Sequence, residues 1–309
     1  MGNLSTVLLV LMLMVTAGCS AQRPTDAGTT GNNSKISVLD SRGKEIIFDS
    51  PPNRIVSLSP AHTEIFYMLG LENYLVGVDS FSDFPDQVSK KPQVGDAFTL
   101  NIEAVVGLEP DLIYTTFDGP VEVLEELGLR VLYIFPAKDV KGVLQNIKLL
   151  GDITDREYEA KDVIERIESQ IEVAKSRLSG IEAEFRVYYE LDPGLYTVGD
   201  DSFVGDILSM LGLENIGAGS DSPYPKISEE VIIFNDPEII ILADGREFVA
   251  TGTTVGEVSK RPGWQSITAI KRKSIYIVDG SLISRPGPRI GLGVEKIVDF
   301  ILDAHSKQS

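Results

Sequence analysis

Few side chains in this sequence are of the kinds that carry out covalent or metal chemistry. The 309 residues include two histidines, His62 and His305, and a single cysteine, Cys19. His62 lies in the segment SPAHTE close to Ser59, but no second base-and-orienter pair accompanies them, so a catalytic triad is not supported. A cluster of His and Cys that could bind zinc or manganese is also missing from the sequence. We therefore predict no catalytic residues, no metal site and no enzymatic activity.

The sequence instead offers aromatic and basic side chains that could contact a ligand. Five aromatic residues lie in predicted loops: Phe81, Phe98, Phe117, Tyr196 and Tyr224. Aromatic rings supply flat apolar contact, and polar groups around them supply hydrogen bonds. Three arginines, Arg246, Arg285 and Arg289, could meet an anionic group such as a phosphate, carboxylate or propionate. Each assignment has an alternative, because aromatic loop residues often only pack and Arg289 could brace the last helix.

The elements that must position these residues alternate between short strands and helices. Apolar runs predict strands at residues 55–58, 74–78 and 112–114, and helical spacing predicts helices at 63–69 and 102–108. Such alternation indicates a parallel sheet covered on both faces. Ligands bind beyond the carboxyl ends of the strands in these sheets. Here those ends are followed by Ser59-Pro60, which ends the first strand, and by the loops 79–85 and 115–119.

A long internal repeat indicates two similar lobes. The sequence MLGLEN occurs at residues 68–73 and again at 210–215. In both copies a loop with proline follows, SDFP at 82–85 and SPYP at 222–225, and then a short helix, a proline and a strand. The spacing far exceeds the roughly 20–50 residues of a solenoid unit. We predict a first lobe at 36–139 with a leading hairpin and a second lobe at 181–305.

A helical segment at residues 140–180 is predicted to join the lobes. It has no proline and little glycine, and apolar residues such as Val143, Ile147 and Leu150 recur at helical spacing. Gly151-Asp152 could split it, with Thr154 as an N-cap. A coiled-coil partner helix is the alternative, although the heptads are not sustained.

The N-terminal segment is predicted to direct export and lipid attachment. The apolar run at residues 4–17 is shorter than the about 20 residues that span a bilayer, but it suits a signal peptide. Thr16-Ala17-Gly18-Cys19 resembles a lipobox, which implies a signal peptide at 1–18, a lipid on Cys19 and a flexible tether at 19–35. An uncleaved anchor is the alternative. The net charge of −18 argues against binding to nucleic acid or to an anionic membrane surface.

Five motifs together resemble one family of binding proteins: RIVSLSPAHTE, GVDSFSDFP, NIEAVVGLEPDLI, SPYPKISEE and PGPRI. They are similar to motifs of the substrate-binding proteins of ABC importers that carry cobalamin, haem and ferric siderophores, and most similar to the cobalamin-binding branch. The resemblance covers residues 54–300. It implies an α/β fold with two similar lobes, each with a central parallel sheet, joined by a long rigid helix and separated by a ligand cleft. It also implies a monomeric, extracytoplasmic protein, lipid-anchored to the cell membrane, that delivers its ligand to a permease dimer with its ATPase.

The resemblance also assigns roles to individual residues. Phe81, Tyr224 and Tyr196 match positions of aromatic contact to the ligand, and a further stretch that matches one closing over the ligand contains Ser281, Leu282, Ile283, Ser284 and Arg285. Glu103 and Glu230, at equivalent points of the repeat, match surface glutamates that pair with arginines of a two-fold permease. The cobalamin branch often has tryptophan where this sequence has Ala97 and Thr116, so the cleft is expected to be wider or shaped for another ligand.

These features predict a solute-binding lipoprotein that captures cobalamin or a related corrinoid and needs no cofactor of its own. The alternatives are a ferric-siderophore or haem binding protein of the same fold and a membrane-anchored ligand sensor. A hydrolase is a distant third reading, because it would require a His-centred triad that the sequence does not supply.

Overall fold

The computed structural model describes residues 35–96, 98–181, 184–245 and 247–308. The predicted signal peptide, Cys19, nearly all of the predicted tether, Ala97 and Arg246 lie outside these ranges. The described chain opens with the predicted hairpin, in which β1 (Ile36–Leu39) pairs antiparallel with β2 (Glu45–Phe48). Alternation of buried and exposed positions turns Val38, Ile46 and Phe48 toward the core.

The first lobe is built on a parallel sheet with the strand order β4-β3-β5-β6. Its strands are β3 (Ile55–Leu58), β4 (Leu75–Val78), β5 (Leu112–Thr115) and β6 (Val131–Tyr133). Every residue of β3, β5 and β6 is buried, as expected for parallel strands covered on both faces. The helices of this lobe are α1 (Pro60–Met68), η1 (Asp86–Lys90), α2 (Ile102–Gly107) and α3 (Val121–Glu126).

The second lobe repeats this topology. Its parallel sheet has the order β10-β9-β7-β8, so in both lobes the first strand lies between the second and the third. The strands are β7 (Arg186–Glu190), β8 (Glu214–Asn215), β9 (Ile239–Leu242) and β10 (Ile275–Ile277). The helices are α6 (Phe203–Met210), α7 (Glu229–Asn235), α8 (Val255–Val258), η2 (Trp264–Ser266), α9 (Thr268–Arg272) and α10 (Gly280–Ile283).

The MLGLEN repeat has the same conformation in both lobes. In each copy a helix ends at the methionine, and the glycine two residues later has a left-handed backbone, with φ of 71° at Gly70 and 72° at Gly212. Glycine adopts this conformation without the clash that a Cβ would cause. The chain then enters the second strand of the sheet, β4 or β8. The predicted α/β architecture of two similar lobes is thus confirmed.

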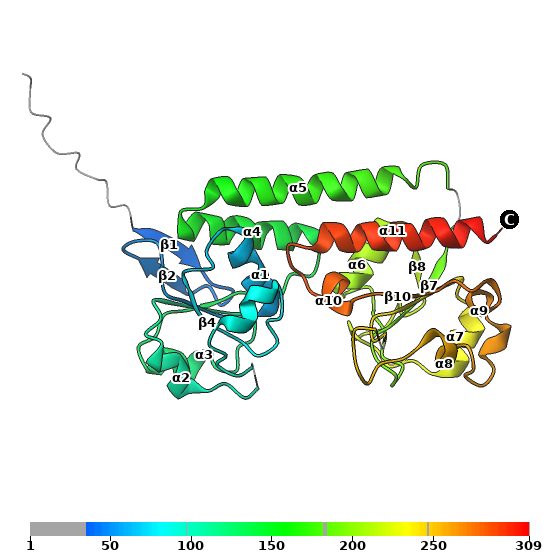
Figure 1. Ribbon diagram of the computed structural model, residues 1–309, viewed down its shortest axis with the longest axis horizontal. Coiled ribbons are helices and arrows are strands. Elements are labelled where there is room, and N and C mark those ends of the chain that lie inside the picture. Colours follow the sequence, from blue (N-terminus) through cyan, green and yellow to red (C-terminus); the bar gives the residue numbers. More distant parts are fainter. Residues whose placement is uncertain (1–34, 97, 182–183, 246, 309) are drawn as a thin grey trace, which may run out of the picture. The chain divides into compact units, whose positions relative to one another are not determined.

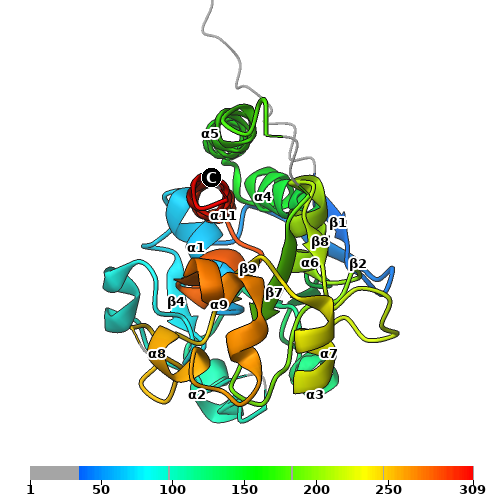
Figure 2. The same ribbon diagram turned by 90° about the vertical axis from the view of Figure 1, so that its right-hand side faces the viewer.

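Three long helices form a layer that connects the lobes: α4 (Val140–Thr154), α5 (Glu157–Ser176) and α11 (Ile290–Ser306). Helix α4 contacts α1 in the first lobe and α6 in the second, and α5 packs along both α4 and α11. Figures 1 and 2 show α4 and α11 between α5 and the two sheets. The connection is therefore a helical layer rather than a single long helix.

The break in the predicted linker lies later than its sequence suggested. Helix α4 continues through Gly151 to Thr154, which is its last residue rather than an N-cap, and Asp155 follows as the C-cap with φ of 57°. The Thr154 hydroxyl donates a hydrogen bond to the Leu150 carbonyl, which keeps it inside the helix. Gly151 serves packing instead, since a Cβ there would lie 2.5 Å from the Ala160 Cβ of α5.

The first helix also begins earlier than predicted. Ser59 is the N-cap residue of α1 and Pro60 its first helical residue, so Ser59-Pro60 ends β3 and starts the helix at once. Proline suits this position because its fixed φ is helical and its missing N–H would have no partner there. The immediate turn from β3 into α1 brings Ser59 and His62 to the carboxyl end of the sheet.

Candidate functional site

A cavity of about 450 Å³ lies where the two lobes meet. The first lobe lines it with Ser59, Pro60, Ala61 and His62 after β3, Thr116 after β5 and Pro136 after β6. The second lobe lines it with Gly280, Ser281, Ser284, Arg285 and Pro286 from α10 and the residues after it. The cavity therefore lies at the carboxyl ends of the first-lobe strands, where the sequence predicted a cleft. Thr116, which stands where the cobalamin branch often has tryptophan, is part of this lining.

His62 is a buried, neutral part of the cavity wall. Its Nε2 lies 3.2 Å from Asn146 Nδ2 and its Nδ1 lies 2.9 Å from Ser59 Oγ. Since the amide nitrogen of Asn146 can only donate, Nε2 accepts and the Nδ1–H donates to Ser59. The ring stacks on Tyr114 with 4.1 Å between centroids, and burial lowers the pKa of His62 to about 3. No carboxylate contacts this imidazole among the described residues, so the Ser59–His62 pair does not form a triad.

A chain of hydrogen bonds fixes the base of the loop that carries Phe81. Asp79 accepts hydrogen bonds from the Phe81 backbone N–H and from Ser82 Oγ, both at 2.8 Å. Ser82 Oγ also lies 2.9 Å from Thr63 Oγ1, which in turn donates to Ser57 Oγ in β3. Burial raises the pKa of Asp79. The loop is thus anchored to α1 and β3, while the Phe81 ring at its tip is 63% exposed.

The predicted aromatic residues lie on loops outside the cavity lining. In the first lobe the rings of Phe98 and Phe117 lie 5.3 Å apart, and Phe98 is 83% exposed. In the second lobe Tyr196 and Tyr224 are also exposed, and a β-bridge between Tyr196 and Lys226 holds their two segments together. The structure therefore brings Phe98 to Phe117 and the Tyr196 segment to the Tyr224 segment. None of the five aromatic residues lines the cavity itself.

Within the predicted segment 281–285, three of the five side chains line the cavity. Ser281, Ser284 and Arg285 belong to the lining, and Ser284 Oγ lies 3.0 Å from the Tyr189 hydroxyl. Ile283 is fully buried in the hydrophobic core and Leu282 packs against that core. The short helix α10 explains this difference, because successive residues of a helix point to different sides.

Arg285 and Arg289, predicted to meet an anionic ligand group, are already paired with carboxylates of the first lobe. Arg289 donates to both oxygens of Glu64, from Nε and Nη2, each at 2.7 Å. Arg285 Nη1 donates to Glu64 Oε1 and to Asp83 Oδ1, both at 2.8 Å. Glu64 is 1% exposed. Sequence reasoning missed Glu64, whose only signal was a carboxylate among the apolar residues of a predicted helix.

The two predicted docking glutamates occupy equivalent, exposed places. Glu103 is the second residue of α2, whose N-cap Asn101 accepts a hydrogen bond from the Ala104 backbone N–H at 3.0 Å. Glu230 is the second residue of α7, whose N-cap is Ser228. A hydrogen bond with the Ser228 side chain lowers the pKa of Glu230, which keeps it ionised. Carboxylates in the first turn of a helix are stabilised by the positive end of its dipole.

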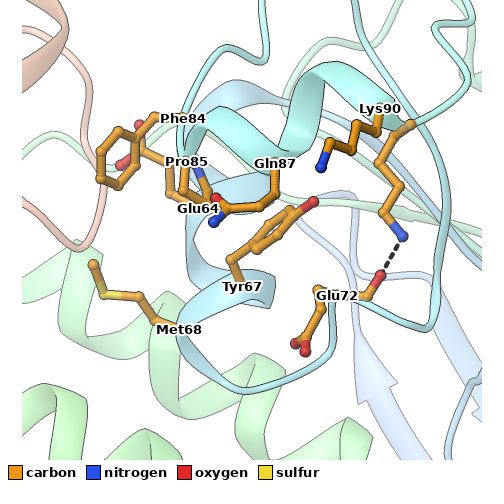
Figure 3. Close-up of a pocket in the computed structure, with 9 residues that line it drawn as sticks. Glu64, Tyr67, Met68, Glu72, Phe84, Pro85, Gln87 and Lys90 are labelled. Carbon is orange, nitrogen blue, oxygen red and sulfur yellow. Dashed lines mark hydrogen bonds between the residues drawn. The ribbon is translucent and has the colours of Figure 1, made fainter.

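A second cavity, of about 660 Å³, lies in the first lobe between α1 and the segment 84–91 (Figure 3). Its lining is Glu64, Tyr67, Met68, Glu72, Phe84, Pro85, Gln87, Lys90 and Lys91. Lys91 Nζ donates to the Glu72 carbonyl and ties the two sides together (Figure 3). No residue of the predicted ligand site lies here, but Glu64 is shared between this cavity and the arginine pairs.

Within residues 35–96, 98–181, 184–245 and 247–308, no group of three or more His, Cys, Asp or Glu side chains is arranged to hold a metal ion. None of the helices in the same ranges has both the length and the apolar character needed to cross a membrane.

Comparison with known proteins places these features in a family context. A family model described as periplasmic binding protein matches residues 55–282. The uncharacterised ABC transporter substrate-binding lipoprotein YvrC of Bacillus subtilis is 29% identical over 306 residues, which cover 95% of each chain. A crystal structure of a possible iron-binding (periplasmic solute-binding) protein from Staphylococcus epidermidis is 31% identical, with a TM-score of 0.70, over 82% of this chain and 99% of that one. The periplasmic vitamin B12 binding protein BtuF of Vibrio cholerae is 25% identical, with a TM-score of 0.69, over 82% and 98%.

Proposed function

Because this chain belongs to the periplasmic binding protein family, we propose that it is the substrate-binding protein of an ABC importer whose cargo is cobalamin or a related corrinoid. The observation that carries the choice of cargo is the charge of the inter-lobe cavity. Its lining consists of hydroxyl, proline and alanine side chains, a neutral histidine and one arginine, Arg285. That arginine is already neutralised by Glu64 and Asp83.

A cavity of this kind favours a large ligand without excess negative charge. Haem carries two carboxylates and ferric siderophores are often polyanionic, and each would need unpaired cations that the described lining does not offer. A corrinoid is fringed with neutral amides, which can exchange hydrogen bonds with Ser59, Thr116, Ser281 and Ser284. The net charge of −18 on the whole chain also disfavours the approach of an anionic ligand.

The cavity is too small to hold a whole corrinoid, so we assign the rest of the ligand to the exposed aromatic loops. Pockets for drug-sized ligands measure about 300–1,000 Å³, and a corrinoid is larger than such ligands. A cavity of about 450 Å³ therefore holds only one part of the molecule. In the proposed complex the rest lies between the loops of Phe81, Phe98 and Phe117 in the first lobe and those of Tyr196 and Tyr224 in the second.

Delivery of the ligand is assigned to the two exposed glutamates. Glu103 and Glu230 have the same place in two lobes of the same topology, so they can present matching charges to the two halves of a permease dimer. Attachment to the membrane is assigned to a lipid on Cys19, and the naming of YvrC as a lipoprotein supports this proposal.

The second candidate is a ferric-siderophore or haem binding protein of the same fold. The similarity to a solute-binding protein described as possibly iron-binding favours it. Isothermal titration with cyanocobalamin, haemin and several ferric siderophores separates the two candidates. We expect micromolar or tighter binding for cyanocobalamin and much weaker binding for the anionic ligands. Tight binding of haemin or a siderophore, together with none of any corrinoid, would exclude the proposed cargo.

Docking is tested by uptake of the ligand in cells that express the cognate permease and ATPase. The double variant Glu103→Ala, Glu230→Ala should lose uptake while it retains ligand binding in solution. The matched control is Glu122→Ala, Glu126→Ala, which removes two carboxylates from α3 that are also exposed. Full uptake by the Glu103, Glu230 variant, or equal loss in the control, would refute the docking assignment.

A further inference from the structure

A cluster of four charged residues joins the two lobes beside the cavity. Both carboxylates, Glu64 of α1 and Asp83 of the loop after β4, come from the first lobe. Both guanidinium groups, Arg285 and Arg289, come from the second-lobe segment between α10 and α11. The cluster contains two negative and two positive charges, so its net charge is zero. The buried Glu64 is paired with both arginines across the lobe boundary.

The same second-lobe segment forms part of the cavity wall. We call residues 284–289 the strap. Ser284, Arg285 and Pro286 line the cavity, and Arg289 immediately precedes α11. The strap lies directly on α1, since a Cβ added at Gly287 would be only 3.5 Å from Ala61. The wall of the cavity and the contact with Glu64 therefore belong to one short stretch of backbone.

The geometry of the contact fixes orientation as well as distance. Arg289 meets Glu64 through two parallel hydrogen bonds, an arrangement that restricts rotation of both groups. The guanidinium also lies over the Phe84 ring, 4.1 Å from its centroid, and Nη2 donates to Ser281 Oγ at 3.2 Å. Phe84 also lines the second cavity (Figure 3), so its contact with Arg289 links the cluster to that cavity.

We propose that Glu64 is a positioning residue of the ligand site. It holds the strap against α1, so that the two lobes already have the separation that ligand binding requires before the ligand arrives. The importance of this role for transport rests on the proposed function, but the separation itself can be measured without any ligand. The competing explanation is that the cluster only adds stability, as an ion pair within a single lobe does.

The experiment measures the distance between the lobes in the ligand-free full chain. Spin labels are attached at Glu126→Cys on α3 and at Lys260→Cys after α8, two exposed positions far from the cluster in sequence. Cys19→Ser removes the only natural cysteine. Pulsed electron–electron double resonance should give one narrow distribution of label-to-label distances for the parent protein. The Glu64→Gln variant should add a second, longer component.

Two controls separate positioning from general stability. Glu238→Gln breaks a bidentate pair with Arg186 that lies entirely within the second lobe, so the distance distribution should stay unchanged. The double variant Glu64→Gln, Arg289→Gln removes one charge of each sign and leaves Arg285 paired with Asp83, which avoids an unpaired buried charge if Glu64→Gln alone folds poorly. It should show the longer component as well. A parent-like distribution in the double variant would overturn the proposal.

Measurements of ligand binding distinguish a failure of this inference from a failure of the proposed cargo. If cyanocobalamin binds the parent protein, Glu64→Gln should bind it several times more weakly, because part of the binding free energy is then used to re-form the wall. If cyanocobalamin does not bind the parent, the proposed cargo fails, while the ligand-free distances still decide the role of Glu64.

Discussion

The burial of His62 predicts a specific dependence of stability on pH. Its imidazole is enclosed by Ser59, Asn146 and Tyr114, and burial lowers its pKa from 6.5 to about 3. Because the unfolded chain takes up a proton at this histidine below pH 6.5 and the folded chain does not, stability is complete above that pH. It should fall as the pH decreases toward about 3 and then level off.

The magnitude follows from the linkage between proton binding and folding. Each pH unit below the unfolded pKa lowers the free energy of unfolding by about 1.4 kcal/mol. Between pH 6.5 and about pH 5 the loss from His62 alone is about 2 kcal/mol. Other groups also make stability depend on pH, since burial raises the pKa of Glu190 and a hydrogen bond with Arg42 lowers that of Glu125. The histidine must therefore be isolated by comparison with a variant.

The assay is urea denaturation of the parent protein and of His62→Gln at several pH values. The variant should be less stable at neutral pH, because it loses the ring stacking on Tyr114. The difference in free energy of unfolding between the two proteins should decrease by about 2 kcal/mol between neutral pH and about pH 5. Only the parent loses stability through protonation of this histidine in the unfolded chain. A difference that stays constant with pH, or an NMR signal of His62 that titrates near pH 6.5, would refute the reasoning.

Three further predictions follow from packing and charge. Glu64→Gln should lower the free energy of unfolding by about 3–5 kcal/mol in chemical denaturation, because it leaves two arginines with one carboxylate; a loss below about 1 kcal/mol, as for a surface pair, would contradict it. Phe81→Ala and Tyr224→Ala should each weaken corrinoid binding by about 3- to 10-fold in titration. Tyr158 is also an exposed aromatic residue but lies on α5, so Tyr158→Ala should leave binding unchanged. Gly151→Val should destabilise the protein by about 1–3 kcal/mol, since even a Cβ there would meet α5; an unchanged thermal midpoint would show that α5 can shift.

Much of the fold could be predicted because its signals are local. Strands buried on both faces read as apolar runs, as in Leu112–Thr115, and the MLGLEN repeat marks the same helix end in each lobe. The place of the cavity near Ser59 followed from the rule that parallel sheets bind ligands at their carboxyl ends. These inferences need only neighbouring residues and the handedness of strand connections.

The parts that could not be predicted depend on contacts between distant residues. Glu64 meets its two arginines across 221 and 225 positions of sequence, and a lone carboxylate in a helix pattern indicates a solvated face. Gly151 resembled a helix breaker because its role in packing against α5 is visible only in three dimensions. Residues 282 and 283 were assigned to the ligand with their neighbours, and only the helical turn of α10 shows that they face the core.

The continuity of the hydrophobic core limits how the ligand can enter. One cluster of buried residues includes Ile55 of the first sheet, Ile167 of α5, Ile297 of α11 and Ile239 of the second sheet. Moving the lobes far apart as rigid bodies would break this cluster and shear α5 against α4 and α11, so loss of the Glu64 contact is expected to open the lobes only by a small rotation about the helical layer. Close-packed interiors resist such shear because the lost contacts are not replaced by others. The tips of the loops around the cleft have no comparable packing, as the exposure of Phe81 and Tyr224 indicates. Ligand capture is therefore expected to move these loops far more than the helical layer.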